Sequence, residues 1–349
     1  MAAIPLRDET LKEVKDKVVV ITGSAHGIGL ATVSLLYTHG AKVIHGDWDG
    51  KAGGLIDSSL SSSSSTSNPQ NAQAQVLVQV PGGETTFVQT DVTDYASVLN
   101  LFDTAWKKYG RVDVAISNAG VQEVGGWFEK GLDLEGVRVK PPTKTIDVNL
   151  LGTLYFSRIA AVYLSQSPSP KDKSLLLLSS TAGFKETPGL FTYSASKHGV
   201  LGLLRSLRPY LPKTHGVRTN AICPWMTDTV MVKGIRDAWM ENKLPVNMPE
   251  GVARVVVEVA VGAVPGAGTE GEEGGKEGGE GKGGRGRMKD EFEGEDRVVR
   301  YNGRAVFVEG GRGWDIEVGI EGTEEVWLGA EVSRTLNRGQ DVLGDGTDW

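Results

Sequence analysis

Short runs of apolar, mostly β-branched or leucine residues recur along the chain and predict buried strands. Each run is followed by small or polar residues, as in a parallel sheet where buried strands lead into turns. We assign strands to residues 17–21, 42–46, 86–89, 112–116, 175–178, 217–222 and 305–308. The spacing of these runs leaves room for a helix between most of them.

Between the strands, apolar residues recur at helical spacing. Helices are expected within residues 30–37, 98–106, 146–156, 193–209 and 249–261. This alternation predicts an α/β fold: a Rossmann-like, doubly wound parallel sheet of about seven strands with helices on both faces. We expect one such domain over residues 1–349, with ligands bound at the carboxyl ends of the strands.

Two low-complexity stretches interrupt this pattern. The regular pattern dissolves at residues 50–75, and the Ser-rich part, at about 58–75, is expected to be a solvated loop that replaces part of a helix. An insertion at about 263–300 contains residues 266–286, which are almost wholly Gly, Glu, Lys and Arg. Such a composition buries too little apolar surface to fold, so we expect disorder there.

The C-terminal tail, residues 317–349, carries one predicted amphipathic helix from Glu324 to Leu336. Two interpretations are open. The helix packs against its own body or a second subunit, or it covers a substrate cleft.

Composition narrows the class of protein. The net charge of −7 argues against a nucleic-acid surface, and Cys223 as the sole cysteine excludes an intramolecular disulfide. No apolar run approaches the ~20 residues of a membrane span, and the N-terminus lacks the apolar core of a signal peptide. We expect a cytoplasmic enzyme with no metal site.

A glycine-rich turn follows the first long strand and opens the next helix. Its candidate cofactor-binding residues are Gly23, Ser24, Gly27, Ile28 and Gly29. Glycine lets a phosphate approach the backbone at a helix N-terminus, where free N–H groups favour anions. The turn therefore indicates a dinucleotide site.

Two further strand ends carry candidate nucleotide contacts. Asp47 ends the second strand, where a carboxylate accepts ribose hydroxyls and repels a 2′-phosphate, which favours NAD over NADP. Asp47 as a simple turn residue is the alternative, and His26 adds possible positive charge beside the phosphates. Asn118, Ala119 and Gly120 end the fourth strand, and Asn118 either approaches the nucleotide or holds the turn.

The candidate chemistry centres on Tyr193 and Lys197, which lie four residues apart and so share one helix face. A phenol has a pKa of about 10, and a neighbouring ammonium brings it towards a useful range. Such a pair also arises by chance on solvated helices. Asn149, within an apolar helix, needs hydrogen-bond partners and is otherwise a structural amide.

These motifs occur together in one order: Thr22-Gly23-x-x-x-Gly27-Ile28-Gly29, Asn118-Ala119-Gly120, Ser180, then Tyr193-x-x-x-Lys197. In this the chain resembles the short-chain dehydrogenase/reductase family over roughly residues 17–229, and again at the last strand. A fainter likeness is to hydroxyprostaglandin dehydrogenases. The chain departs from the family at Trp225, where glycine usually follows the proline, so substrate-side geometry is open.

The resemblance implies a role for each matching catalytic residue. Tyr193 would be the acid/base, and Lys197 would lower its pKa and hold the nicotinamide ribose. Ser180, thirteen residues before Tyr193, would orient the substrate oxygen. Asn149 would bind a water molecule for a proton relay.

The resemblance also adds cofactor contacts. Asp91 and Val92 match the adenine-side position, and Thr229 matches the threonine that contacts the carboxamide of the nicotinamide.

We therefore predict an oxidoreductase that transfers hydride between NAD(H) and a secondary alcohol or ketone. The substrate is expected to be a bulky apolar or aromatic molecule, and the protein a homo-oligomer, dimer or tetramer. The aromatic and Met residues that suggest this substrate are Trp127, Phe128, Phe184, Phe191, Trp225, Met226, Met231 and Trp239. The alternative is a non-catalytic dinucleotide sensor on the same fold, which has no need for Ser180, Tyr193 and Lys197 together.

Overall fold

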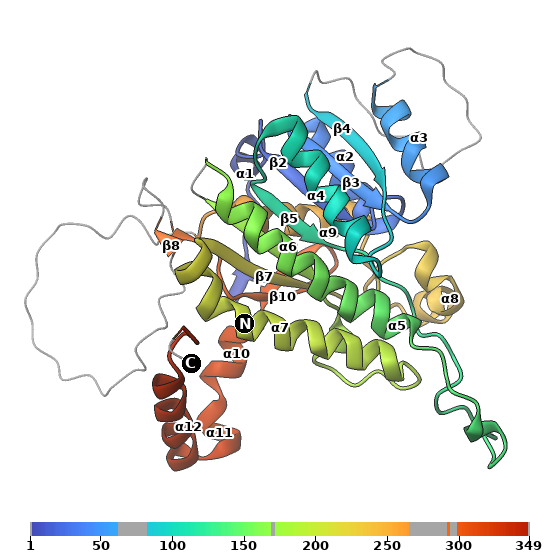
Figure 1. Cartoon of the computed structure of the whole chain (residues 1–349). Helices are drawn as coiled ribbons and strands as arrows, with labels where there is room; N and C mark the ends of the chain where they lie inside the picture. The colour runs from blue at the N-terminus through green and yellow to red at the C-terminus, as the bar shows by residue number, and fades with distance from the viewer. Residues whose placement is uncertain (1, 62–81, 169–171, 265–291, 294–298, 348–349) are drawn as a thin grey trace, which may run out of the picture.

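The computed structural model describes residues 2–61, 82–168, 172–264, 292–293 and 299–347. Their main feature is a nine-stranded sheet with helices on both faces (Figure 1). The strands run in the order β1-β11-β10-β7-β6-β5-β2-β3-β4. Their bounds are β1 Ala2–Ile4, β2 Val18–Thr22, β3 Lys42–Asp47, β4 Glu84–Gln89, β5 Val114–Ser117, β6 Lys173–Leu178, β7 Val217–Pro224, β10 Ala305–Glu309 and β11 Arg312–Asp315.

The seven strands from β4 to β10 are parallel, which confirms the predicted fold class. The sequence pattern missed β11 and β1, which extend one edge antiparallel. Gly310 and Gly311 both have positive φ, 56° and 73°, and form the tight turn that returns the chain from β10 into β11. β11 lacks an apolar run and β1 is only three residues long, so the sequence pattern could not find them.

The helices cover two apolar cores, one on each face of the sheet. Alternate residues of β2 point to opposite faces, so Val18 and Val20 join one core and Val19 and Ile21 join the other. Helices α4, α6 and α7 cover the first core, and α2 and α9 cover the second (Figure 1). Their bounds are α2 Gly27–Thr38, α4 Tyr95–Tyr109, α6 Gly152–Gln166, α7 Phe191–His215 and α9 Pro249–Val261.

The predicted solvated loop at about 58–75 is wrong for its first residues, which belong to a helix, and the loss of pattern from residue 50 does not mark a loop. Residues Gly50–Ser61 form helix α3. The Asp49 carboxylate accepts hydrogen bonds from the N–H groups of Lys51 and Ala52, and so caps this helix. Glycines and serines concealed its apolar positions, and the remainder of the predicted loop lies outside the described residues.

The tail forms three short helices: α10 Glu317–Gly322, α11 Glu324–Leu328 and α12 Ala330–Leu343. The prediction of a single helix from Glu324 to Leu336 is wrong, because Gly329, with φ of +80°, separates α11 from α12. Glu317 pairs with Arg205 and Arg208 of α7 at 2.8 and 3.0 Å. The tail thus packs against the C-terminal half of α7, away from the first turn that carries Tyr193 (Figure 1).

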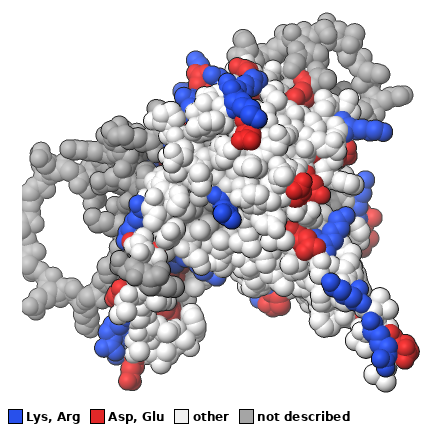
Figure 2. All heavy atoms as spheres, in the orientation of Figure 1, with Lys and Arg blue, Asp and Glu red and all other residues white. Residues whose placement is uncertain are grey.

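On the face drawn in Figure 2, acidic and basic side chains are scattered in small mixed groups, and no basic band crosses it. Along the residues that the structure describes, no helix is long and apolar enough to cross a membrane. The same residues contain no group of three or more His, Cys, Asp or Glu side chains placed to hold a metal ion.

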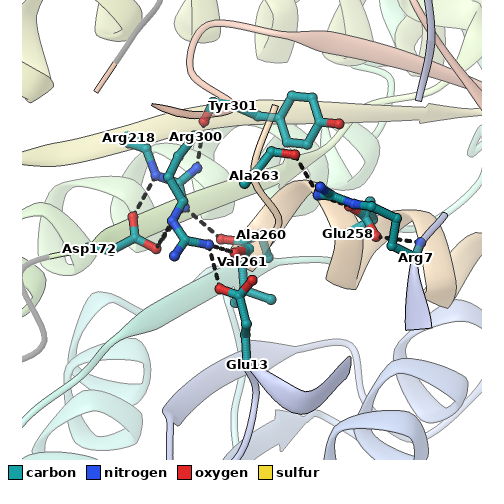
Figure 3. A network of polar contacts seen from close by, with 10 residues as sticks. All are labelled: Arg7, Glu13, Asp172, Arg218, Glu258, Ala260, Val261, Ala263, Arg300 and Tyr301. Carbon is teal, nitrogen blue, oxygen red and sulfur yellow. Dashed lines mark hydrogen bonds and ion pairs between the residues drawn. The ribbon is translucent and has the colours of Figure 1, made fainter. Parts of the chain in front are cut away.

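A polar network pins both ends of the insertion (Figure 3). The Arg218 side chain is fully buried at the start of β7 and pairs with Asp172 at 2.7 Å. Arg300 also contacts Asp172, at 3.6 Å. The Val264 N–H donates to the carbonyl of Val299 at 2.7 Å, so the chain leaves and returns at one point. This point lies at the amino ends of β6 and β7, opposite the predicted site.

Because the two ends are held together, replacing residues 266–286 with a short Gly/Ser linker is expected to leave folding and turnover nearly intact. Each halving of the loop changes its closure entropy by only about 0.6 kcal/mol. Urea denaturation and steady-state turnover of the shortened protein check this.

Arg218→Met is the contrasting variant, since it leaves Asp172 partly uncompensated and should destabilise the fold by on the order of 3 kcal/mol. Severe loss of activity in the shortened protein would show that the excised segment has a function.

Candidate active site

The glycine turn lies at the carboxyl end of β2, held against β5 by Asn118. Gly23 has φ of +70°, and a Cβ on Gly29 would lie 1.9 Å from the Gly23 carbonyl oxygen. The Asn118 side-chain amide donates to the carbonyls of Thr22 and Gly23 at 3.0 and 2.8 Å. Asn118 therefore holds the turn, which is the structural alternative left open above. Where Gly29 passes the backbone of Gly23, only glycine fits.

Helix α2 begins within this turn, at Gly27. Its N-cap residue, His26, makes no side-chain cap, so the first backbone N–H groups have no partner within the helix. Thr229 lies beside this end, because a Cβ on Gly27 would approach its Cγ2 to 2.8 Å. Free N–H groups beside small residues fit the pyrophosphate of a dinucleotide.

The Ser24 side chain has a structural task. It is buried, its hydroxyl donates to the carbonyl of Gly46 at 3.2 Å, and it lies 3.0 Å from Nδ1 of His45. The other ring nitrogen of His45 lies 2.9 Å from Asp57 of α3. The Ser24 N–H also donates to the Gly46 carbonyl, at 3.2 Å, so both the backbone and the side chain of Ser24 hold the turn to β3.

Asp47 ends β3 and faces the glycine turn. One carboxylate oxygen accepts the N–H of Ala25 at 2.9 Å, and the other accepts that of Asp49 at 3.0 Å. A carboxylate has about four acceptor positions, so two remain for ribose hydroxyls. His26 lies 3.6 Å from Asp49, which places its possible charge beside another carboxylate.

The adenine-side pair lies after β4. Asp91 is exposed, and one carboxylate oxygen accepts both the N–H and the hydroxyl of Thr93. Val92 is buried, and its side chain lies where a Cβ on Gly152 would approach it to 2.9 Å. Val92 could therefore meet a nucleotide only through its backbone.

The candidate catalytic residues meet at the first turns of α7. Lys197 Nζ lies 5.6 Å from the ring centroid of Tyr193, and the Ser180 hydroxyl lies close enough to the phenol to lower its pKa. Ser180 also accepts the N–H of Ala182 at 3.2 Å, at the start of the 3₁₀ turn Thr181–Gly183. The neighbouring Ser179 instead donates to the carbonyl of Lys197 at 2.9 Å. The structure thus brings Ser180 to the phenol and uses Ser179 for packing.

Asn149 lies in a π-helical turn, Asp147–Leu151, between α5 (Lys144–Ile146) and α6. Its Oδ1 accepts the N–H of Val121, and its Nδ2 donates to the Val121 carbonyl and to Ser196. These bonds use both amide hydrogens, which supports the structural alternative for the side chain. The proposed water contact stays a prediction.

Burial dominates the electrostatics of the cluster. It lowers the pKa of Lys197 to about 8, and the ammonium group donates to the carbonyl of Leu178 at 2.9 Å. Burial also raises the pKa of Tyr193, against the hydrogen bond from Ser180, which lowers it. The expected lowering of the phenol pKa by Lys197 is therefore not what this structure shows. Burial raises the pKa of Cys223 to about 12, so that thiol is inert.

Sequence reasoning missed Glu123, which binds the first turn of α7. The N-cap residue of that helix, Leu190, makes no side-chain cap. Glu123 accepts instead, from Thr192 and from the N–H of Tyr193. Some 70 residues separate the partners, so no local motif could indicate the contact.

Comparison with known proteins agrees with this geometry. The family model described as short chain dehydrogenase matches residues 17–239. The chain belongs to the short-chain dehydrogenase family. The match spans the glycine turn, the Ser180–Tyr193–Lys197 cluster and Thr229.

Individual relatives are similar over much of their length. Short-chain dehydrogenase/reductase prx4 of Penicillium rubens is 29% identical over 333 residues, 94% of this chain and 85% of that protein. The NAD(+) 15-hydroxyprostaglandin dehydrogenase of Mus musculus is 31% identical, over 64% of this chain and 71% of that protein. The solved structure of gox2181, 24% identical, has a TM-score of 0.56 over 72% of this chain and 92% of that one, a likeness of fold.

The buried ammonium predicts a pH-dependent stability. The pKa of Lys197 falls from 10.5 in the unfolded chain to about 8 in the fold, so the unfolded chain binds more protons between these values. Stability should rise with pH from about 8 to about 10.5, by up to about 3 kcal/mol, and this contribution is absent below about pH 8. Lys197→Met should lack this rise. Urea denaturation of both proteins at several alkaline pH values measures it, and parallel pH curves would contradict it.

Proposed function

We propose that the protein is an NAD(H)-dependent oxidoreductase that interconverts a secondary alcohol and a ketone. The observation that carries this proposal is the cluster of Ser180, Tyr193 and a buried Lys197, beside a glycine turn suited to a dinucleotide. A sensor would need the turn but not Ser180, Tyr193 and Lys197 together.

The cluster divides the work of proton transfer. In the oxidation direction Tyr193 takes the alcohol proton, and Ser180 donates a hydrogen bond to the same substrate oxygen as it becomes a carbonyl. Lys197, with Nζ 5.6 Å from the Tyr193 ring, is assigned to hold the nicotinamide ribose and to place a positive charge near the phenol while the proton is transferred. A bound nicotinamide supplies the hydride acceptor or donor. Asn149 holds the segment at Val121 against α7, and we assign it the link to solvent through water.

Gly120 lies beside the Lys197 ammonium group and the Asn149 amide. A Cβ on Gly120 would lie 3.5 Å from Lys197 Nζ and 3.3 Å from Asn149 Oδ1. Because glycine has no side chain at this position, a nicotinamide ribose can approach the Lys197 ammonium group. This fits the assignment of Lys197 to the ribose hydroxyls.

Asp47 supports NAD as the cofactor. Its carboxylate lies at the carboxyl end of β3, where a 2′-phosphate would meet a like charge. The related hydroxyprostaglandin dehydrogenase is named for NAD(+). NADP is the weaker candidate.

Two aromatic pairs include residues close in sequence to the candidate site and support a bulky apolar substrate. Phe191, two residues before Tyr193, packs edge-on against Phe128 at 4.9 Å, and both are exposed. Trp225 packs edge-on against Trp239 at 5.1 Å. Phe184 and Met226, by contrast, serve the interior. We propose a lipid-like or aromatic secondary alcohol, a homo-oligomeric enzyme and a cytoplasmic setting.

Tyr193→Phe tests the proposed function, because it keeps the ring and removes the proton acceptor. We expect kcat to fall by at least ~10²-fold, with NAD affinity little changed. Ser180→Ala should lower turnover, and Lys197→Met should lower both turnover and NAD affinity. Fluorescence titration with NAD, and turnover on a panel of hydroxylated and keto compounds, give the two quantities. Wild-type turnover in Tyr193→Phe would overturn the assignment.

Cofactor choice is tested by titrating NAD and NADP into the wild-type protein and Asp47→Asn. We expect wild type to prefer NAD, and the variant to move the affinity ratio towards NADP by about tenfold, or ~1.4 kcal/mol. Asp49→Asn is the matched control, since that carboxylate is turned towards the N–H groups of α3. Equal or tighter NADP binding by wild type sinks the assignment.

A further inference from the structure

Hydrogen bonds hold residues 121–124, which follow β5, to three other parts of the chain. Val121 exchanges two hydrogen bonds with the amide of Asn149. Thr145 accepts the N–H of Val124 and donates to the carbonyl of Gln122, both at 3.1 Å. The Gln122 amide in turn donates to the carbonyl of Met231, which lies in the 3₁₀ turn Val230–Val232. The segment is thus a rigid support beside the catalytic cluster.

Glu123 extends from this support to the catalytic helix. One carboxylate oxygen accepts the N–H and the hydroxyl of Thr192, at 3.2 and 2.7 Å. The other accepts the N–H of Tyr193 at 2.7 Å. A carboxylate is the favoured partner for the free N–H groups of a helix N-terminus, and here it caps a helix whose own N-cap residue does not.

We propose that Glu123 is a positioning residue for Tyr193: it fixes the first turn of α7 so that the phenol stays beside the Ser180 hydroxyl. The proposal rests on the function proposed above. The N–H that Glu123 binds belongs to Tyr193 itself, so a shift of this turn moves the phenol directly. Lys197 lies one turn further on and is held separately by Leu178 and Ser179, so it would stay in place.

A displaced phenol should also titrate differently. The groups that face Tyr193 are Lys197 on its own helix, Ser180 after β6, Cys223 on β7, and the Glu123 carboxylate at its backbone. The hydrogen bond from Ser180 lowers the phenol pKa. Losing that bond raises the pKa, so the ascending limb of the pH–rate profile for oxidation should move to higher pH.

The experiment compares Glu123→Gln and Glu123→Ala with wild type. Gln is isosteric, but its NH₂ cannot accept, so one N–H of the first turn is left unpaired in either amide orientation. We expect kcat to fall by about tenfold in Gln and by up to about 100-fold in Ala, with NAD affinity within about twofold of wild type. The pH limb should move to higher pH in both. Glu186→Gln, an exposed carboxylate of the same region paired with Lys185, should change none of these.

Amide hydrogen exchange of residues 190–197 gives a readout independent of turnover, and we expect faster exchange in both Glu123 variants. An active wild type with unchanged kcat and pH limb in Glu123→Ala would overturn the positioning role alone. A wild type that binds NAD but turns over no substrate would overturn the proposed function. If amide hydrogen exchange of residues 190–197 were then also unchanged in the Glu123 variants, the proposal for Glu123 would be overturned as well.

Discussion

The close approach of α7 to the carboxyl end of β6 is the constraint on which the site depends. Lys197 reaches the Leu178 carbonyl at 2.9 Å, and its own carbonyl accepts from Ser179. A Cβ on Gly183 would lie 2.8 Å from the Lys197 carbonyl oxygen. Small residues are thus required where helix and strand meet, and they place Lys197 and Tyr193 at the strand ends.

This constraint opposes stability and supports chemistry at the same place. An ammonium group removed from water destabilises the fold, which is why its pKa falls to about 8. In the proposed mechanism, the same low dielectric strengthens the effect of the Lys197 charge on Tyr193 while the proton is transferred. Two neighbouring groups whose pKa values are shifted by burial, beside a glycine turn suited to a nucleotide, are typical of a functional site.

The sequence predicted those features that depend on local pattern. Apolar runs located the seven parallel strands, and the glycine turn at Gly23 and the Tyr193–Lys197 spacing needed only neighbouring residues. The edge strands, α3 and the break at Gly329 were missed because tertiary pairing, a cap at Asp49 and one backbone angle decided them.

Side-chain roles were predicted less well than positions. Ser24 and Asn118 lie where a nucleotide turn requires, yet their side chains hold the turn to β3 and β5. Glu123 touches the catalytic helix across a long sequence separation, and no periodicity records such a contact. Burial of Tyr193, which reverses the expected direction of its pKa, is likewise a property of the assembled fold.

The central claim is that this cluster moves a proton while hydride passes to NAD. The most direct measurement uses a secondary alcohol turned over by the wild-type enzyme, with deuterium on its carbinol carbon, and follows the label by mass spectrometry. We predict that the label appears on the reduced nicotinamide, one equivalent for each ketone formed. Ketone formed without label on the nicotinamide, or label lost to water, would contradict the account.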